Sequence, residues 1–525
     1  MSFPGGKFHS KWTKLTFCFL FVLPLLYPFL LKPGEQLYSD HLGKFILGES
    51  VERNGFLSGN LVLPSRSLDP EGNYCPTECI RIGQELISPF PAALGYVYAI
   101  FLPWSGIVGV YVAVTILVLL SFLFLSILWD WDPIYLGVLV LASPFLINGY
   151  FFPDVGIASF LFIGGSFLFL RSGASSSWFR FVGSGFICAS AAWFRIESIV
   201  FPLSFIFFLS VSKFSNIEER KKIYGYSFGF LIGVGLLLGI QYLLYGHPLG
   251  PRFSFNQPTM FLLPWKKWKI FTGLLIANPN RIGFFGYTPA FLIVLFFSVY
   301  YIFFKKNPFK RSIASEISNR DLFVYSGLVA FLALVISAPN DGIIDFGSRY
   351  LHLSLPAFAG MFLILVGNIT EKFRKIGKIV LFAILLYSVY ISFSYTQILG
   401  KYGRKTTKMN SIYLEQKPDL VVVQIRTYSQ ILGKYFFQTP SVWLMRESHI
   451  KNFFSKNDPE QFKKILFVQT KASILESLND ADPFLKNKYY ESITQSLGPD
   501  FQKVWSENKE DVLIFSMERK SKIRE

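Results

Sequence analysis

An acidic residue stands a few positions after the first apolar segment of the chain, in Tyr38-Ser39-Asp40-His41. The residues after Asp40 predict an amphipathic helix, because Leu42, Phe45, Ile46 and Val51 recur at helical spacing. A carboxylate at the boundary between water and lipid can act as a general base toward an attacking hydroxyl or amine. It can also cap the helix that follows. The spacing alone leaves both roles open.

A second acid, Asp154, follows Pro153 at the junction between two apolar stretches. Its carboxylate could bind a divalent metal, orient a charged headgroup or start the next helix. We expect it to lie on the same side of the membrane as Asp40.

Two ionisable residues, Arg195 and Glu197, interrupt the apolar stretch Phe181 to Val211. Charges near membrane depth are costly and are therefore candidates for function, either as a mutual pair or as ligand contacts. An arginine can hold a phosphate through paired N–H donors. The stretch is too long for one crossing, so we interpret it as a short helical hairpin with both residues partly solvated at its outer tip.

Arg349 and Tyr350 precede another apolar stretch, and Arg349 is our first candidate for a phosphate-binding cation. Arg252, in a loop rich in proline and glycine, is the second candidate. Arginine at the end of a membrane helix is also a common anchor that reaches toward the headgroups. These residues complete the predicted binding set of Asp154, Arg195, Glu197, Arg252, Arg349 and Tyr350.

The sequence does not indicate a bound cofactor. The five histidines show no metal-ligand spacing, and neither a phosphate-cradling glycine loop nor a serine nucleophile elbow occurs. We therefore predict no metal site, although a divalent metal at Asp154 stays open. Cys75 and Cys79 lie close together in the first loop, and the sequence leaves open whether they pair.

Composition indicates that these residues belong to a polytopic α-helical membrane protein. Hydrophobic residues make up 52% of the 525 residues, whereas charged residues make up 16%. We expect about eleven membrane-spanning helices, each long enough to cross the hydrocarbon layer. Four predicted spans contain no Asp, Glu, Lys or Arg: Ser105 to Leu128, Ile134 to Phe152, Ile223 to Tyr245 and Ile282 to Phe304. The first apolar run, Leu15 to Leu31, is interpreted as a retained signal anchor.

The distribution of positive charge predicts the orientation. The formal net charge is +17, and the basic residues gather in short segments between spans, which is typical of cytoplasmic loops and not of nucleic-acid binding. We therefore predict a multi-pass protein of the plasma (inner) membrane with a cytoplasmic N-terminus. Four segments then face outward: 32–103, 246–281, 338–349 and the tail after about residue 397. Within the first loop, Pro89 to Leu102 is expected to form a helix lying in the interface.

The chain divides into two predicted domains. Residues 1–399 form the transmembrane domain with its large outer loop 32–103, and residues 400–525 form a small extracytoplasmic α/β domain, because short apolar runs alternate there with polar helical stretches. One octapeptide nearly repeats, at Tyr395 to Tyr402 and at Tyr428 to Tyr435. Two copies are too few for a solenoid.

Taken in order, these features resemble the GT-C glycosyltransferases, and most closely the protein mannosyltransferase and aminoarabinose transferase branch. The resemblance covers about residues 14–399 and rests on short motifs: the acid of the first outer loop, Ser88-Pro89-Phe90-Pro91, Pro-x-x-x-Asn before Asp154, and Arg-Tyr-x-x-x-x-x-Pro from Arg349 to Pro356. The sequence departs from the family pattern where His41 replaces a second acid and where Ser-Pro-Phe-Pro replaces His-Pro-Pro.

This resemblance implies an enzyme that moves a sugar, with inversion, from a polyprenyl-phosphate carrier to a lipid, glycan or protein acceptor on the outer face of the membrane. It implies that Asp40 is the catalytic acid of the first loop, that Asp154 is the second outer-face acid, and that Arg349 lies near the carrier phosphate. The expected partners are the lipid-linked sugar, the acceptor and membrane lipids, and not nucleic acid.

Two other classes of function remain open. A secondary transporter would also have many spans and a few intramembrane charges, but transporters commonly contain two related halves, which the sequence does not show. A non-catalytic component of polysaccharide assembly or export is the other alternative, in which the C-terminal domain would be the working part.

Overall fold

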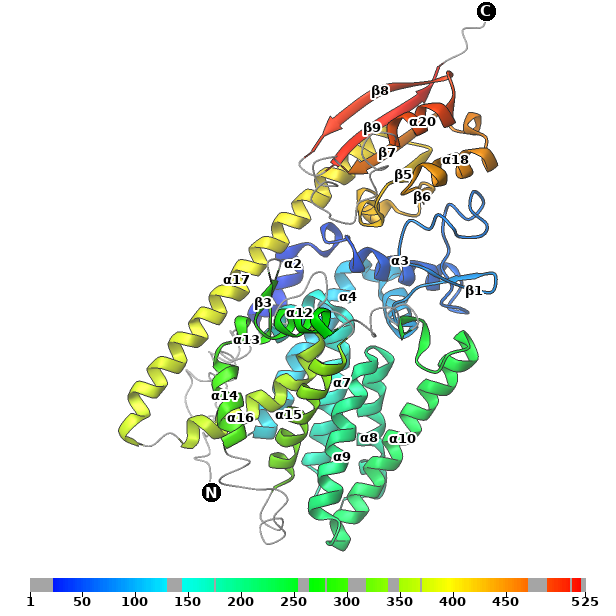
Figure 1. The fold of residues 1–525 in the computed structure, drawn as a ribbon. Helices are drawn as coiled ribbons and strands as arrows, with labels where there is room; N and C mark the ends of the chain where they lie inside the picture. Colours follow the sequence, from blue (N-terminus) through cyan, green and yellow to red (C-terminus); the bar gives the residue numbers. More distant parts are fainter. Residues whose placement is uncertain are drawn as a thin grey trace, which may run out of the picture. The chain divides into compact units, whose positions relative to one another are not determined.

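Figure 1 shows the fold as a computed structural model. It describes residues 22–129, 144–173, 176–253, 264–278, 281–300, 318–338, 349–368, 371–470, 489–509 and 512–520. The chain forms two compact units. Unit 1 comprises 1–30 and 109–398, and unit 2 comprises 31–108 and 399–525. The first loop and the tail thus share a compact unit, and the predicted division into domains 1–399 and 400–525 stays a prediction.

Unit 1 is built almost entirely from helices. Its elements are α6 (Phe145–Phe151), α7 (Pro153–Leu170), α8 (Trp178–Ser190), η3 (Ala191–Trp193), η4 (Ile196–Ile199), α9 (Val200–Lys213), α10 (Ile217–Tyr245), α12 (Pro264–Leu275), β3 (Ala277–Asn278), β4 (Arg281–Ile282), α13 (Phe284–Tyr287), α14 (Ala290–Tyr300), α15 (Asn319–Ser337), η6 (Arg349–Ser354) and α16 (Leu355–Asn368). The helix α17 (Glu371–Gln416) continues from unit 1 into unit 2. The predicted first span, residues 15–31, ends in two short helices, η1 (Leu23–Leu26) and α2 (Tyr27–Leu31). Residues 15–21 of this span lie outside the described part of the chain.

Six helical segments among the described residues are long and apolar enough to cross a membrane. They are Ala92–Trp129, Pro153–Leu170, Ile196–Lys213, Ile217–Tyr245, Asn319–Ser337 and Ala383–Gln416. Because each has the length that a bilayer core demands, the polytopic α-helical class predicted from composition is confirmed. The count of about eleven spans stays a prediction.

The predicted hairpin at Phe181 to Val211 is confirmed. Two helices, α8 and α9, are joined by the short turns η3 and η4. That the turns face the outer side of the membrane stays a prediction. In contrast, the predicted span from Ile282 onward begins later. Ile282 belongs to the strand β4, and α14 starts only at Ala290, directly after Pro289. The residue before a proline is disfavoured in helical conformation, which explains the delayed start.

Small residues and aromatic rings hold the helices of unit 1 together, and α7 to α10 lie side by side (Figure 1). A Cβ atom added at Gly185 of α8 would stand 2.0 Å from the Tyr226 carbonyl oxygen of α10, so only glycine permits this approach. Phe201 of α9 contacts two further rings, with centroids 4.4 Å from Phe162 and 4.9 Å from Phe323.

Unit 2 contains the first loop. It includes α3 (Asp40–Arg53), the hairpin strands β1 (Ile80–Ile82) and β2 (Glu85–Ile87), and the first part of α4 (Ala92–Trp129). The predicted helix within 89–102 therefore exists, and it is separated from the following span by a non-helical residue, Gly106, at φ 61° and ψ −165°. Its placement in the interface stays a prediction.

The tail of unit 2 forms the α/β arrangement that the sequence predicts. Its elements are β5 (Leu420–Val423), η7 (Arg426–Ile431), η8 (Gly433–Tyr435), β6 (Ser441–Trp443), α18 (Glu447–Lys456), η9 (Pro459–Gln461), β7 (Lys464–Thr470), α20 (Tyr489–Leu497), β8 (Phe501–Asn508) and β9 (Val512–Arg519). The sheet has the strand order β6-β5-β7-β9-β8, in which β6, β5 and β7 are parallel and β9 and β8 are antiparallel.

Alternate residues of this sheet enter two separate cores, as the two-residue period of a strand requires. Leu420 and Val422 pack with residues of α18 and α20. Val421 and Val423 pack with first-loop residues and with the end of α17. Backbone contacts also join loop and tail, since the Trp443 N–H donates to the Tyr74 carbonyl at 2.8 Å. The first loop is therefore part of the same folded body as the tail.

Cys75 and Cys79 are joined as a disulfide in unit 2, which resolves the alternative that the sequence left open. Disulfides persist on the oxidising side of a membrane. In a variant with Cys18 and Cys188 replaced by Ser, we expect no labelling of intact cells by a membrane-impermeant maleimide. Cys75→Ala in the same background should expose Cys79 to the reagent. Labelling only after the cells are broken would contradict the predicted outward orientation of the first loop.

Candidate functional site

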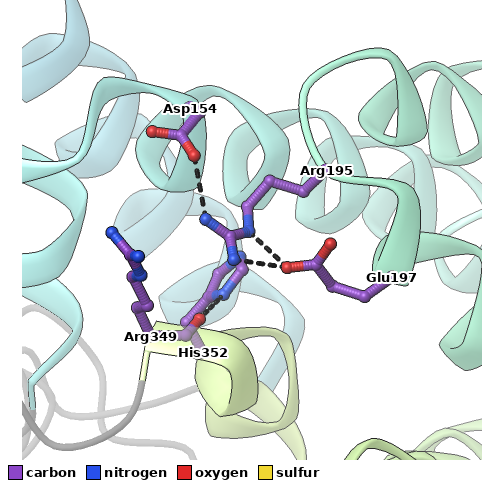
Figure 2. Close-up of polar contacts among 5 residues, drawn as sticks. All are labelled: Asp154, Arg195, Glu197, Arg349 and His352. Carbon is purple, nitrogen blue, oxygen red and sulfur yellow. Dashed lines mark hydrogen bonds and ion pairs between the residues drawn. The ribbon is translucent and has the colours of Figure 1, made fainter. Parts of the chain in front are cut away.

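Four of the predicted residues meet in a buried ion cluster in unit 1, and Figure 2 shows that they come from separate elements. We use the name ion cluster for Asp154, Arg195, Glu197, Arg349 and His352. Asp154 lies in the first turn of α7, after Pro153 at the helix start. Arg195 and Glu197 come from the η3–η4 turns, and Arg349 and His352 come from η6.

Arg195 is the centre of the cluster. Its Nη1 donates to Asp154 Oδ2 at 2.8 Å, and its Nε donates to Glu197 Oε1 at 2.6 Å. Arg195 is extended, with φ −147° and ψ 106°, because the helical hairpin breaks at this residue. Its side chain is only 2% exposed, so the expectation of a partly solvated arginine is wrong. The helices around the turn bury it against α7 instead.

The pairing satisfies both carboxylates at once. A buried charge is tolerated only when it is paired and hydrogen-bonded. The sequence predicted that Arg195 and Glu197 either pair or contact a ligand, and the pair is observed. The bond to Asp154 links positions 41 residues apart.

Arg349 is buried in η6 and rests on aromatic faces. Its guanidinium carbon lies 4.6 Å from the centroid of the Phe152 ring and 5.8 Å from that of Tyr350. The Tyr350 ring also stands 5.5 Å from the Arg195 guanidinium carbon. Such cation–π contacts are strongest where water is excluded. The sequence selected Arg349 and Tyr350 but missed Phe152, which directly precedes Pro153 and Asp154.

Arg252 is the sixth predicted binding residue. It is half-buried and close enough to Glu197 for electrostatic attraction. Within this set of described residues, three guanidinium groups (Arg195, Arg252 and Arg349) face two carboxylates (Asp154 and Glu197). The five side chains therefore sum to one positive charge, which suits an anionic ligand.

His352 is the residue that the sequence analysis did not select. Its Nδ1 hydrogen-bonds to the Arg349 carbonyl oxygen, and the ring is 1% exposed. It interacts electrostatically with Arg195, Glu197 and Asp154. The only local signal was its spacing of three residues from Arg349, which places both on one turn.

Asp40 lies in unit 2. It is the first residue of α3 and is half-buried. Ser39 before it is the helix N-cap residue, at φ 47° and ψ −128°. A non-glycine residue at positive φ is strained, and such strain gathers at functional positions. That Asp40 shares a site with Arg349 stays a prediction.

The helix that Asp40 begins is buried on most sides. Leu42, Phe45, Ile46 and Val51 are buried, as their spacing predicted, but His41 and Lys44 are buried as well. The predicted apolar face of the amphipathic helix is therefore observed, but the helix has no fully exposed polar face, because His41 and Lys44 are buried too. Lysines are rarely buried fully, and Lys44 stands one turn after Asp40, with its Nζ 5.7 Å from the centroid of the Phe90 ring. Residues four apart on a helix are neighbours, so the spacing from Asp40 could have identified Lys44 as a candidate site residue.

No group of three or more His, Cys, Asp or Glu side chains among the described residues is placed to hold a metal ion. The loop 339–348 before Arg349, and the residues 254–263 after Arg252, lie outside the described part of the chain.

Comparison with known proteins shows the fold. No protein-family profile and no curated protein sequence matches the chain. Among solved structures, that of ArnT from Cupriavidus metallidurans bound to undecaprenyl phosphate aligns with a TM-score of 0.53 at 11% identity, covering 95% of this chain and 97% of ArnT.

The chain has an ArnT-like fold. The alignment spans nearly all of both chains, so the likeness to ArnT concerns the fold of the whole chain. Together with the six candidate spans, the ArnT-like fold makes the protein an integral membrane protein.

Proposed function

We propose that the protein is a glycosyltransferase that takes a sugar from a polyprenyl-phosphate carrier. The observation that carries the proposal is the buried ion cluster together with Arg252, because these residues contain three arginines and only two carboxylates. Its fold is that of ArnT, an aminoarabinose transferase whose structure was solved with undecaprenyl phosphate bound.

The electrostatics of the cluster support binding of a carrier phosphate. Arg195, Arg252 and Arg349 stand against Asp154 and Glu197, which leaves one positive charge in excess within this set. A phosphodiester brings one negative charge, which neutralises that set. The Phe152 and Tyr350 rings both lie close to the Arg349 guanidinium, and packing against them would restrict its orientation. Arginine binds phosphate through two parallel N–H donors, and a fixed plane favours this geometry.

The proposed reaction is a single displacement at the anomeric carbon. An acceptor oxygen or nitrogen attacks that carbon while its proton passes to the Asp40 carboxylate. The bond between the anomeric carbon and the phosphate oxygen breaks, and its electron pair leaves with the polyprenyl phosphate. Negative charge thus grows on the phosphate, where Arg349 and Arg252 would stabilise it. One displacement inverts the anomeric configuration.

The proposal includes the location of the site. We place the N-terminus in the cytoplasm of a cell with the protein in its plasma (inner) membrane, and the site on the outer face. The acceptor is then a lipid, glycan or protein that reaches that face, and the tail with the first loop forms the extracytoplasmic domain.

The decisive experiment compares Arg349→Met with Arg180→Met, which removes an exposed arginine of α8 as a matched control. Purified variants are tested for binding of undecaprenyl phosphate and for transfer from a panel of radiolabelled undecaprenyl-phosphate sugars. Hydrogen bonds to charged groups contribute about 1.5–3 kcal/mol. We therefore expect Arg349→Met to bind the carrier about 10- to 100-fold more weakly and to lose transfer, while Arg180→Met behaves as wild type.

Equal binding by both variants would remove Arg349 from the phosphate site. If vesicles containing the wild-type protein instead accumulate a substrate without forming a covalent product, the secondary transporter is the better description.

A further inference from the structure

His352 presents a buried hydrogen-bond acceptor that the proposed mechanism does not yet use. Its Nδ1 faces the Arg349 carbonyl oxygen. A carbonyl only accepts, so Nδ1 carries the proton and donates it. In this tautomer Nε2 holds a lone pair. Nε2 is buried and has no hydrogen-bond partner among the described residues.

The surroundings keep the ring neutral. His352 interacts with Arg195, whose positive charge opposes a second proton, and with the acids Glu197 and Asp154, which Arg195 already engages. Arg349 reaches His352 through its backbone carbonyl. A protonated ring would add a further positive charge to a buried set that already has an excess of one. Nε2 is therefore a buried hydrogen-bond acceptor to which no donor among the described residues is bonded.

The same short turns hold other polar atoms without partners. The hydroxyls of Ser198, in η4, and Ser354, in η6, are buried and have no hydrogen-bond partner among the described residues. Buried polar groups are normally satisfied. Three such groups on the two turns that carry Glu197 and Arg349 indicate that a polar ligand completes them.

The carrier phosphate cannot satisfy Nε2, because a phosphodiester has acceptor oxygens and no proton to donate. A sugar can, through a hydroxyl or an amide N–H. The group closest to the phosphate is the one on the carbon next to the anomeric carbon, C2. We infer that His352 Nε2 accepts a hydrogen bond from the C2 hydroxyl or amide N–H of the donor sugar and thereby selects donors that carry one. This inference rests on the proposed function.

The test compares His352→Asn with His352→Gln. Asn keeps an amide N–H near the position of Nδ1 and has no atom at the position of Nε2, whereas Gln can place an acceptor oxygen there. Each variant is measured for binding of undecaprenyl phosphate without sugar, and for transfer from the active undecaprenyl-phosphate sugar and from its 2-deoxy analogue.

We expect both variants to bind undecaprenyl phosphate within about twofold of wild type, because the missing bond is made to the sugar. His352→Asn should transfer the normal sugar about 10- to 100-fold more slowly, as expected when one hydrogen bond to a substrate is lost, and His352→Gln should recover part of this loss. With the 2-deoxy donor, wild type and His352→Asn should have equal rates.

An equal loss by His352→Asn with both donors would overturn the inference, and so would weakened binding of undecaprenyl phosphate, which would indicate a purely structural role. The proposed function fails in a different way, namely if the wild-type protein neither binds undecaprenyl phosphate nor transfers any sugar. The melting temperature of His352→Asn is measured alongside wild type, so that a loss of transfer caused by unfolding is recognised.

Discussion

Replacing Arg195 with Met is expected to destabilise unit 1 more than any other single change in the ion cluster. The substitution leaves two carboxylates, Asp154 and Glu197, without their shared cation; the pair with Asp154 is fully buried and the pair with Glu197 is largely buried. Removing one partner of a buried pair costs about 3–5 kcal/mol. We expect a marked fall in the melting temperature of the detergent-solubilised protein, measured by differential scanning fluorimetry, and no transfer.

The triple variant Arg195→Met, Asp154→Asn, Glu197→Gln is the matched control. It removes the cation and both charges that the cation compensates, so we expect most of the lost stability to return. Arg349 and Arg252 are unchanged in this variant, so we expect it still to bind undecaprenyl phosphate. A melting temperature of Arg195→Met equal to that of wild type would show that the cluster contributes little to folding.

Replacing Asp40 with Asn is expected to give the largest loss of rate among folded variants. Asn has nearly the shape of Asp but cannot take a proton, and general-base catalysis contributes about 10²–10⁴-fold. We expect the rate of transfer to fall by about 10³-fold, with undecaprenyl phosphate bound as by wild type, because Asp40 is assigned to the acceptor and not to the carrier.

Glu52→Gln serves as the control, since it neutralises a half-buried acid on the same helix, α3, three turns further along. Its rate should match that of wild type. If Asp40→Asn transfers sugar at the wild-type rate, Asp40 is not the base, and its position at the start of α3 is structural.

Composition and periodicity were sufficient for the architecture because a bilayer imposes strong rules. Long uncharged runs predict spanning helices, and alternating short apolar runs predict the sheet of the tail. The hairpin at 181–211 also followed from sequence, since 31 residues interrupted by Arg195 and Glu197 are too long for one crossing. The late start of α14 was missed, although Pro289 in the sequence disfavours a helical conformation for the residue before it.

The ion cluster was predictable only in its local parts. Arg195 and Glu197 are two residues apart, so their pairing could be expected. The bond from Arg195 to Asp154 and the role of His352 could not, because they depend on how α7 and η6 pack around the hairpin turn. The spacing of His352 from Arg349 was a weak signal, and only the structure shows that its ring bonds the Arg349 carbonyl and interacts electrostatically with Arg195 and both acids.

The nearly repeated octapeptide adopts two different structures, so its local sequence alone does not determine its conformation. Its first copy, from Tyr395 to Tyr402, is a regular part of α17. Its second copy, from Tyr428, forms the short turns η7 and η8, with Gly433 at φ +48°. The physical reason lies in Asn410, whose Nδ2 donates to the carbonyls of Gln430 and Ile431 at 2.9 and 2.8 Å.

The sequence by itself determined the membrane helices, the tail sheet and the candidate charges. Only the tertiary structure decided how one octapeptide folds in two ways, and which charges meet, because both depend on partners distant in the chain.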